Sequence, residues 1–95
     1  MNAIETLKQS RPEIAVQIIW EEDPYFQWDG DCEEPENMTP YNVEVRASRV
    51  VNGKLVSGHA YLGGCYSADA GKDDPEIGGY LPQMIEEAVA ELDAL

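Results

Sequence analysis

The chain has 95 residues, of which 43% are hydrophobic, and 19 carboxylates against 6 cations give it a formal net charge of −13. This length predicts one domain with a modest core, and the charge opposes direct binding to nucleic acid or to an anionic membrane, so a cationic partner is expected. Because no apolar run approaches the roughly 20 residues of a membrane span and the first residues lack the pattern of a signal peptide, we expect a cytoplasmic protein.

A short helix is predicted for residues 2–10, because Asn2 and Glu5 are spaced as in a capping box and the Arg11-Pro12 pair would end the helix. A strand is predicted for residues 14–22, where apolar side chains alternate with others. The apolar side of this strand would consist of Ile14, Val16, Ile18 and Trp20.

The segment 23–40 is long for a connection in a compact domain, which is typical of a functional loop. One glycine and three prolines keep it out of regular structure: Gly30, Pro24, Pro35 and Pro40. It also carries most of an acidic run that extends from Glu21 to Glu36 with no Lys or Arg inside it.

Residues 41–66 are predicted to form a hairpin, because Asn52-Gly53 is a strong hairpin signal between two strand-like runs. A two-residue turn places Val51 opposite Lys54 and thereby fixes the register of the remaining pairs. The apolar face would pair Ala47 with Gly58, Val45 with Ala60 and Val43 with Leu62; the polar face would pair Ser48 with Ser57, Arg46 with His59 and Glu44 with Tyr61. At the end of the second strand, Gly63-Gly64 is expected to allow a bulge.

The end of the chain has the apolar periodicity of an amphipathic helix, with Pro82 near its start. Its apolar stripe would consist of Leu81, Ile85, Ala88, Leu92 and Leu95. The predicted fold class is therefore α+β in the order α-β-β-β-α: a three-stranded antiparallel sheet with one face covered by the C-terminal helix. We expect residues 1–95 to form a single domain with a long acidic loop at 23–40.

In this fold, the loops 23–40 and 67–78 leave the same end of the sheet. The opposite end would carry Arg11, Arg49 and Lys54, so a domain polarised between an acidic and a mildly basic end is predicted. We expect the first end to bind the partner, through the following residues: Glu21, Glu22, Asp23, Tyr25, Phe26, Trp28, Asp29, Asp31, Glu33, Glu34, Glu36, Asp69, Asp73, Asp74 and Glu76.

The aromatic residues of the long loop have two interpretations. Tyr and Trp often anchor protein interfaces, and surrounding acids steer a basic partner, which favours Tyr25, Phe26 and Trp28 as contact residues. Alternatively, Phe26 and Trp28 fold back to cover a small core. The sequence leaves both interpretations open.

The acidic rows permit imitation of a nucleic-acid backbone. In an extended chain, residues two apart lie roughly 6.6 Å from each other, so Asp29, Asp31 and Glu33 would form a regular row of negative charge. Such a row could occupy a groove that Lys and Arg line for nucleic acid, and the alternative is a solubilising surface.

In size, charge and the acidic rows 21–36 and 69–76, the chain resembles small acidic proteins of phages and plasmids that disable nucleic-acid-binding defence enzymes, among them DNA-mimic anti-restriction and anti-CRISPR proteins. This resemblance implies an inhibitor that engages a basic protein surface and blocks nucleic-acid binding. The element order is also similar to that of the double-stranded-RNA-binding domain, but residues 79–83 lack the basic start that this module needs in its last helix. Direct RNA binding is therefore disfavoured.

A small divalent-cation-binding protein or a structural adaptor without inhibitory role is the alternative function, because residues 29–34 hold closely spaced oxygen ligands. The spacing does not fit an EF-hand, since Glu34 stands where glycine is required and Pro40 where the bidentate Glu should be. We predict no metal ligand and no cofactor, and Cys32 and Cys65 are expected to be free thiols. The two open edges of the sheet would allow a homodimer.

An enzyme is disfavoured, and no catalytic residue is predicted. His59 and Cys65 have the same strand parity, but six residues of strand separate them by roughly 20 Å, which is too far for a thiol and its base. His59 is expected to be a solvated residue opposite Arg46. The carboxylates are expected to lie in loops or on an exposed helix face, without the apolar pocket that acid-base catalysis needs.

Overall fold

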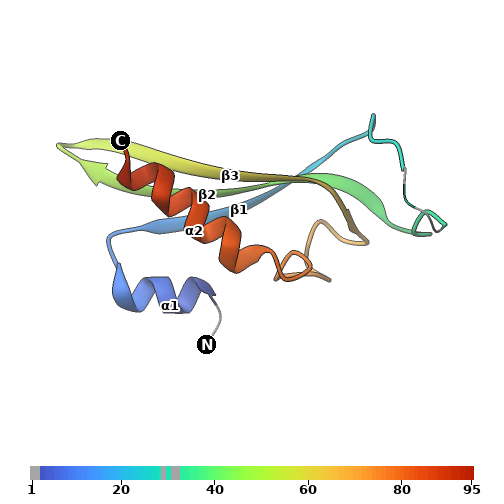
Figure 1. Cartoon of the computed structure of the whole chain (residues 1–95), viewed down its shortest axis with the longest axis horizontal. Coiled ribbons are helices and arrows are strands. Elements are labelled where there is room, and N and C mark those ends of the chain that lie inside the picture. Colours follow the sequence, from blue (N-terminus) through green and yellow to red (C-terminus); the bar gives the residue numbers. More distant parts are fainter. Residues whose placement is uncertain (1–2, 29, 31–32) are drawn as a thin grey trace.

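The computed structural model describes residues 3–28, 30 and 33–95. It has the predicted α+β architecture, a three-stranded antiparallel sheet in the order β1-β2-β3 with one helix before it and one after it (Figure 1). The elements are α1 (Ala3–Ser10), β1 (Ala15–Glu22), β2 (Thr39–Val51), β3 (Lys54–Ser67) and α2 (Leu81–Asp93). Neither of these helices is long and apolar enough to cross a membrane.

The predicted hairpin register is confirmed. Val51 lies opposite Lys54, with Asn52 and Gly53 in the left-handed conformations that a tight turn requires (φ 52° and 78°). From there the pairing continues without interruption to Val43 opposite Leu62. Strand β1 pairs antiparallel with β2, and its apolar side chains share the apolar face of the hairpin.

The expected bulge lies at Gly63-Gly64. The register shifts by one residue between Tyr41 and Val43, so that Tyr41 faces Cys65. Gly64 has a φ of 67°, which a glycine adopts without strain. Because one extra residue reverses the side-chain alternation, the residues after the bulge point to the faces opposite to those predicted by simple parity.

The core lies between the sheet and α2. Val43, Val45 and Ala47 of β2 are 0% exposed beneath the helix. The helix buries Leu81, Met84, Ile85, Ala88 and Leu92. Two details of the predicted stripe were wrong: Met84 belongs to it, and Leu95 does not, because the helix ends at Asp93 and Leu95 is 71% exposed.

Strand β2 begins at Thr39, so the connection from β1 comprises residues 23–38 and is shorter than the predicted loop. Pro40, expected to lie outside regular structure, is the second residue of β2 and faces Tyr66. Its carbonyl accepts a hydrogen bond from the Asp23 N–H at 3.0 Å. A proline fits there because the beginning of a strand loses little by the absence of one N–H. The expected cap residue of α1, Asn2, lies outside the described residues.

Candidate partner-binding end

Most of the negative charge lies at one end of the sheet, at the end of β1 and in the segments 23–38 and 68–78, which we call the acidic end. In the sequence these segments contain twelve of the 19 carboxylates and one of the six cations; the described residues among them are ten carboxylates and Lys72, with a formal charge of −9. Glu22 of β1 pairs with Tyr41, and Tyr41 pairs with Cys65 near the end of β3, so both segments leave the same end of the sheet as predicted. The long segment reaches farthest from the helices (Figure 1), and the molecule measures 48 × 28 × 21 Å.

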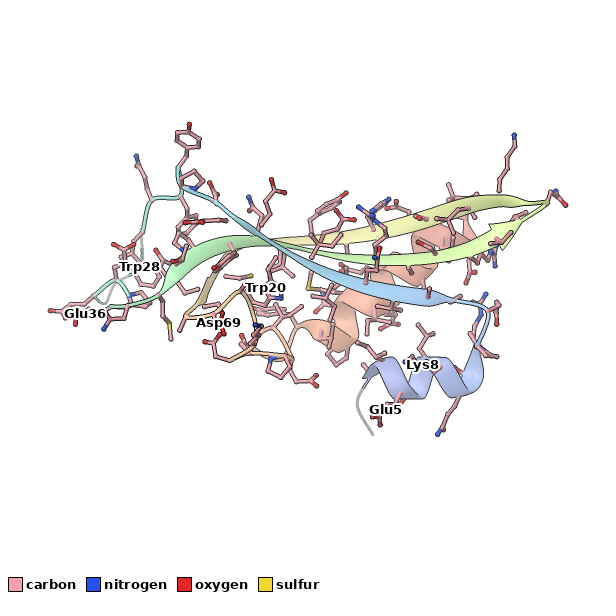
Figure 2. The ribbon with its side chains drawn as sticks, turned by 180° about the vertical axis from the view of Figure 1, so that it is seen from behind. Glu5, Lys8, Trp20, Trp28, Glu36 and Asp69 are labelled. Carbon is pink, nitrogen blue, oxygen red and sulfur yellow. The ribbon has the colours of Figure 1, made fainter. Side chains whose placement is uncertain are left out.

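The two segments occupy different positions at this end. Figure 2 shows Trp28 and Glu36 at the far tip of the molecule, whereas Asp69 lies closer to the body near Trp20. Glu33, Glu34, Glu36, Asp69 and Glu76 are exposed, as are Glu21 and Glu22 at the end of β1. The acidic end is therefore an elongated surface rather than a single cluster.

The long segment begins with a turn. Asp23 accepts a hydrogen bond from the Tyr25 N–H through its side chain (3.2 Å) and one from the Phe26 N–H through its main chain (3.3 Å). This turn leaves Tyr25 89% exposed. Tyr25 is therefore placed as an interface residue would be.

Phe26 and Trp28 pack on Tyr66 at the end of β3. The ring centroids lie 5.9 Å and 5.5 Å from that of Tyr66, both in edge-to-face arrangements. Both side chains are half-buried, and they lie apart from the main core under α2. The two interpretations therefore combine: these aromatics do fold back, but onto a small cluster of their own at the acidic end.

Tyr66 was not predicted as part of the site, and it attaches the acidic segment to the sheet. Its hydroxyl donates a hydrogen bond of 2.6 Å to Glu34, which together with desolvation raises the pKa of Tyr66 to about 12. The ring of Phe26 lies against Gly64, where a Cβ atom would come within 2.9 Å of it. The bulge thus has two effects: it turns Tyr66 toward the long segment and leaves space for Phe26.

The second acidic segment is organised by Ser67 and Asp73. The buried Ser67 hydroxyl donates to the Asp73 carboxylate and accepts hydrogen bonds from the N–H groups of Gly71 (2.8 Å) and Asp69 (3.2 Å). Asp73 also accepts from the Ala68 N–H at 3.2 Å, and these hydrogen bonds, led by that from Ser67, lower its pKa. Asp73 therefore has a structural role in addition to its charge.

A similar role belongs to Asp74, which accepts a hydrogen bond from the Gly78 N–H at 2.9 Å. By contrast, within the described part of the chain the Asp69 carboxylate has only a distant ion pair with Lys72, at 4.0 Å, and its side chain is 67% exposed. In this segment, Asp69 and Glu76 are thus the acids best placed to meet a partner. Asp29 and Asp31 of the predicted site lie outside the described residues.

The opposite end of the sheet is less basic than predicted. Arg11 and Arg49 both pair with Asp93 of α2, at 2.8 and 3.3 Å, and Arg11 also pairs with Glu13 at 3.0 Å. These contacts lower the pKa of Asp93, through the Arg11 hydrogen bond first. The charge of the molecule is therefore distributed between one acidic end and one nearly neutral end.

The open face of the sheet, opposite α2, carries an ionic group that sequence reasoning did not assemble. Glu44 accepts hydrogen bonds from Arg46 and contacts His59, both at 2.8 Å, and the His59 ring stacks on Tyr61 at 6.0 Å. His59 is therefore not simply solvated, and the expectation that carboxylates lie only in loops and on a helix was wrong for Glu44, a strand residue with an 18% exposed side chain. The predicted cross-strand pair of Arg46 and His59, next to Glu44 on the same face, was the sequence feature from which this group could have been found.

The bulge also places His59 and Cys65 on opposite faces of the sheet, so they cannot act as a thiol and its base. His59 lies on the open face, whereas Cys65 faces Tyr41 and packs against the core, so the two no longer share parity. Burial, together with the charge of Asp74, raises the pKa of the Cys65 thiol, the opposite of what a nucleophile needs. Among the described residues, no group of three or more His, Cys, Asp or Glu side chains is placed to hold a metal ion. Most of the candidate cation ligands at 29–34 lie outside the described residues or, like Glu34, bond elsewhere.

Compared with protein-family models, with curated proteins and with solved structures, the chain gives no match.

Proposed function

We propose that the protein is an acidic protein-binding module whose acidic end engages a basic surface of a nucleic-acid-handling protein in the cytoplasm. In its sharpest form, it is an inhibitor of the kind that phages and mobile elements use against restriction or CRISPR systems, and it blocks nucleic-acid binding by occupying the basic surface. The observation that carries this proposal is the segregation of charge: the described residues of the acidic end hold a formal charge of −9, and the described remainder of the chain holds −2.

Several features support binding over mere solubilisation. A solubilising surface mixes both signs of charge and spreads them, whereas here Lys72 is the only cation within the acidic end. The long segment is also held by specific contacts, through Phe26, Trp28 and the bond between Tyr66 and Glu34. Because these contacts already order the segment in the free protein, it loses less conformational entropy when it binds a partner.

The shape supports a protein groove as the target. The long segment is the narrow tip of a 48 Å molecule, so it can enter a groove that accommodates a nucleic-acid strand. Exposed Tyr25 at this tip offers an aromatic anchor among the acids. Charge would then direct the encounter, and the aromatic contact would slow dissociation.

The test is affinity capture from host lysate with two charge-matched variants. One variant, Glu33→Gln with Glu36→Gln, neutralises two exposed acids of the long segment; the control, Glu86→Gln with Glu91→Gln, neutralises two exposed acids of α2. A basic nucleic-acid-binding protein should be captured about three- to ten-fold less well by the first variant and by high salt, and equally well by the control. Equal loss with both variants would reduce the interaction to net charge and refute the proposed site.

A further inference from the structure

The apolar side of β1 is less covered than the strand beside it. Trp20 pairs with Val43, and Ile18 pairs with Val45. The two valines are 0% exposed, whereas both β1 side chains are only half-buried. The packing beneath the sheet is therefore complete at β2 and incomplete at the β1 edge.

The helix layer explains this difference. Helix α2 crosses β2 and β3, and at Gly58 its main chain comes so close that a Cβ atom could not be accommodated. Helix α1 packs against α2, has no buried residue, and lies beside the β1 edge rather than beneath the sheet (Figure 1). Because packed helices lie about 8–10 Å apart and strands about 4.8 Å apart, two helices match about four strands. The sheet has three, so the helix layer extends under one further strand position next to β1.

The main chain of β1 can accept that strand. The tight turn makes Val51 and Lys54 a hydrogen-bonded pair, and the alternation that follows directs the main-chain groups of Val16, Ile18 and Trp20 away from β2. Within Ala15–Glu22 there is no proline, no cation and no register shift. Beta edges that must remain unpaired are usually protected by one of these devices or by covering elements.

A groove follows this edge on the helix side. It has a volume of about 310 Å³ and is lined by Ile18 and Trp20 of β1, Ile4 of α1, Leu81 of α2, and Lys72 and Glu76 of the second acidic segment. The inward side chains of an added strand would enter this groove and cover the half-buried β1 residues. Small or medium apolar side chains fit its size and lining.

The charge around the edge determines the occupant. Glu21 and Glu22 are exposed at one end of β1, and the lining of the groove includes Glu76 and Lys72. A second copy of this chain would bring another charge of −13 to the same edge. A strand with Lys or Arg at the end that meets Glu21 and Glu22 would be attracted instead.

We infer that the outer edge of β1 is a strand-addition site for an extended segment of a partner protein, with alternating apolar residues and Lys or Arg at one end. The added strand runs antiparallel to β1, places its basic end beside Glu21 and Glu22, and inserts its apolar side chains between β1 and α1. Main-chain hydrogen bonds supply affinity, while the groove and the two carboxylates supply specificity. This site uses a different surface from the long segment and does not require a nucleic-acid-handling partner.

The probe is a short acetylated peptide in which two lysines precede alternating valine and threonine, added to the intact protein and followed by its amide NMR spectrum. Binding should shift the amide signals of Val16, Ile18 and Trp20 and slow their exchange with solvent, while the outer edge of β3 is unaffected. The matched control is the same peptide N-methylated at the amides that face β1. It should bind about ten-fold more weakly or worse, because its charge is unchanged and its hydrogen bonds are lost.

Two protein variants complete the experiment. Glu21→Gln with Glu22→Gln should weaken the peptide several-fold, whereas Glu33→Gln with Glu36→Gln should bind it as the intact protein does, which separates this site from the long segment. The inference is overturned if the peptide does not bind, if the methylated peptide binds equally well, or if the shifts are confined to residues 23–38 and 68–78. A dimer in sedimentation that also protects the amides of Val16, Ile18 and Trp20 from exchange without any peptide would overturn it as well, in favour of a second copy as the occupant.

Discussion

Gly64 at the bulge leaves the space in which Phe26 of the long acidic segment packs against the sheet, and substitution by alanine tests this directly. The residue has a φ of 67°, which disfavours an L-residue by about 1–2 kcal/mol. An added Cβ would also lie 2.9 Å from two ring carbons of Phe26, so the ring must move and would loosen its edge-to-face contact with Tyr66. Loss of such an aromatic contact costs about 0.5–1.5 kcal/mol, and the expected total is about 1.5–3.5 kcal/mol.

The matched control is Gly53→Ala in the hairpin turn. Gly53 has a similar φ of 78°, but nothing lies within 4 Å of its would-be Cβ, so this variant reports the backbone term alone. Urea unfolding monitored by circular dichroism should show Gly64→Ala to be less stable than Gly53→Ala by about 1 kcal/mol.

A double-mutant cycle identifies the cause of that difference. In a Phe26→Ala background, the substitution at Gly64 should cost only the backbone term, and the two glycine variants should then be equally destabilised. Equal destabilisation already in the background with Phe26 present would refute the argument, because it would mean that the Phe26 ring does not rest on the bulge.

Three further predictions concern the contacts around this end and the helix above the sheet. Ser67→Ala should destabilise the protein by about 1–3 kcal/mol in urea unfolding, because it leaves the buried N–H of Gly71 without its acceptor; no change would contradict the role of Ser67. In an alkaline absorbance titration, the intact protein should show a tyrosine ionisation near pH 12 that Tyr66→Phe lacks, because the hydrogen bond to Glu34 and desolvation raise the pKa of Tyr66 to about 12. The stabilisation from this hydrogen bond is fully present below about pH 10, the pKa of an unperturbed tyrosine, and is lost as the pH rises through about 12. Gly58→Ala should cost about 1–3 kcal/mol or more by displacing α2, and a neutral result would show that the helix does not touch β3 there.

Turn chemistry and side-chain alternation were sufficient to predict the sheet. Asn52-Gly53 fixed the hairpin register, and the apolar alternation of β1 set the face that it shares with Val45. The turn and the side-chain alternation are both local features of the sequence, and they independently indicate the same register. The prediction could therefore extend to individual cross-strand residue pairs. The same reasoning placed both acidic segments at one end.

The features that sequence reasoning missed depend on the bulge and on contacts between distant residues. A single inserted residue at Gly63-Gly64 moved Cys65 to the core side and Tyr66 to the side of the long segment, and no alternation pattern locates such a step to the residue. The pairing of Asp93 with Arg11, 82 positions apart, depends on where α2 ends over the sheet. The attachment of Phe26 and Trp28 to Tyr66 likewise required the three-dimensional path of the long segment.

A displacement assay is the most direct test of the proposed competition between the acidic end and nucleic acid for a basic protein surface. The partner retained in affinity capture is mixed with a fluorescent nucleic acid that it binds, and anisotropy is followed as the intact protein or a charge variant is added. The intact protein and the variant Glu86→Gln with Glu91→Gln should displace the nucleic acid equally well. The variant Glu33→Gln with Glu36→Gln should need an about three- to ten-fold higher concentration. A ternary complex, in which the partner holds the nucleic acid and this protein together, would contradict the proposed competition.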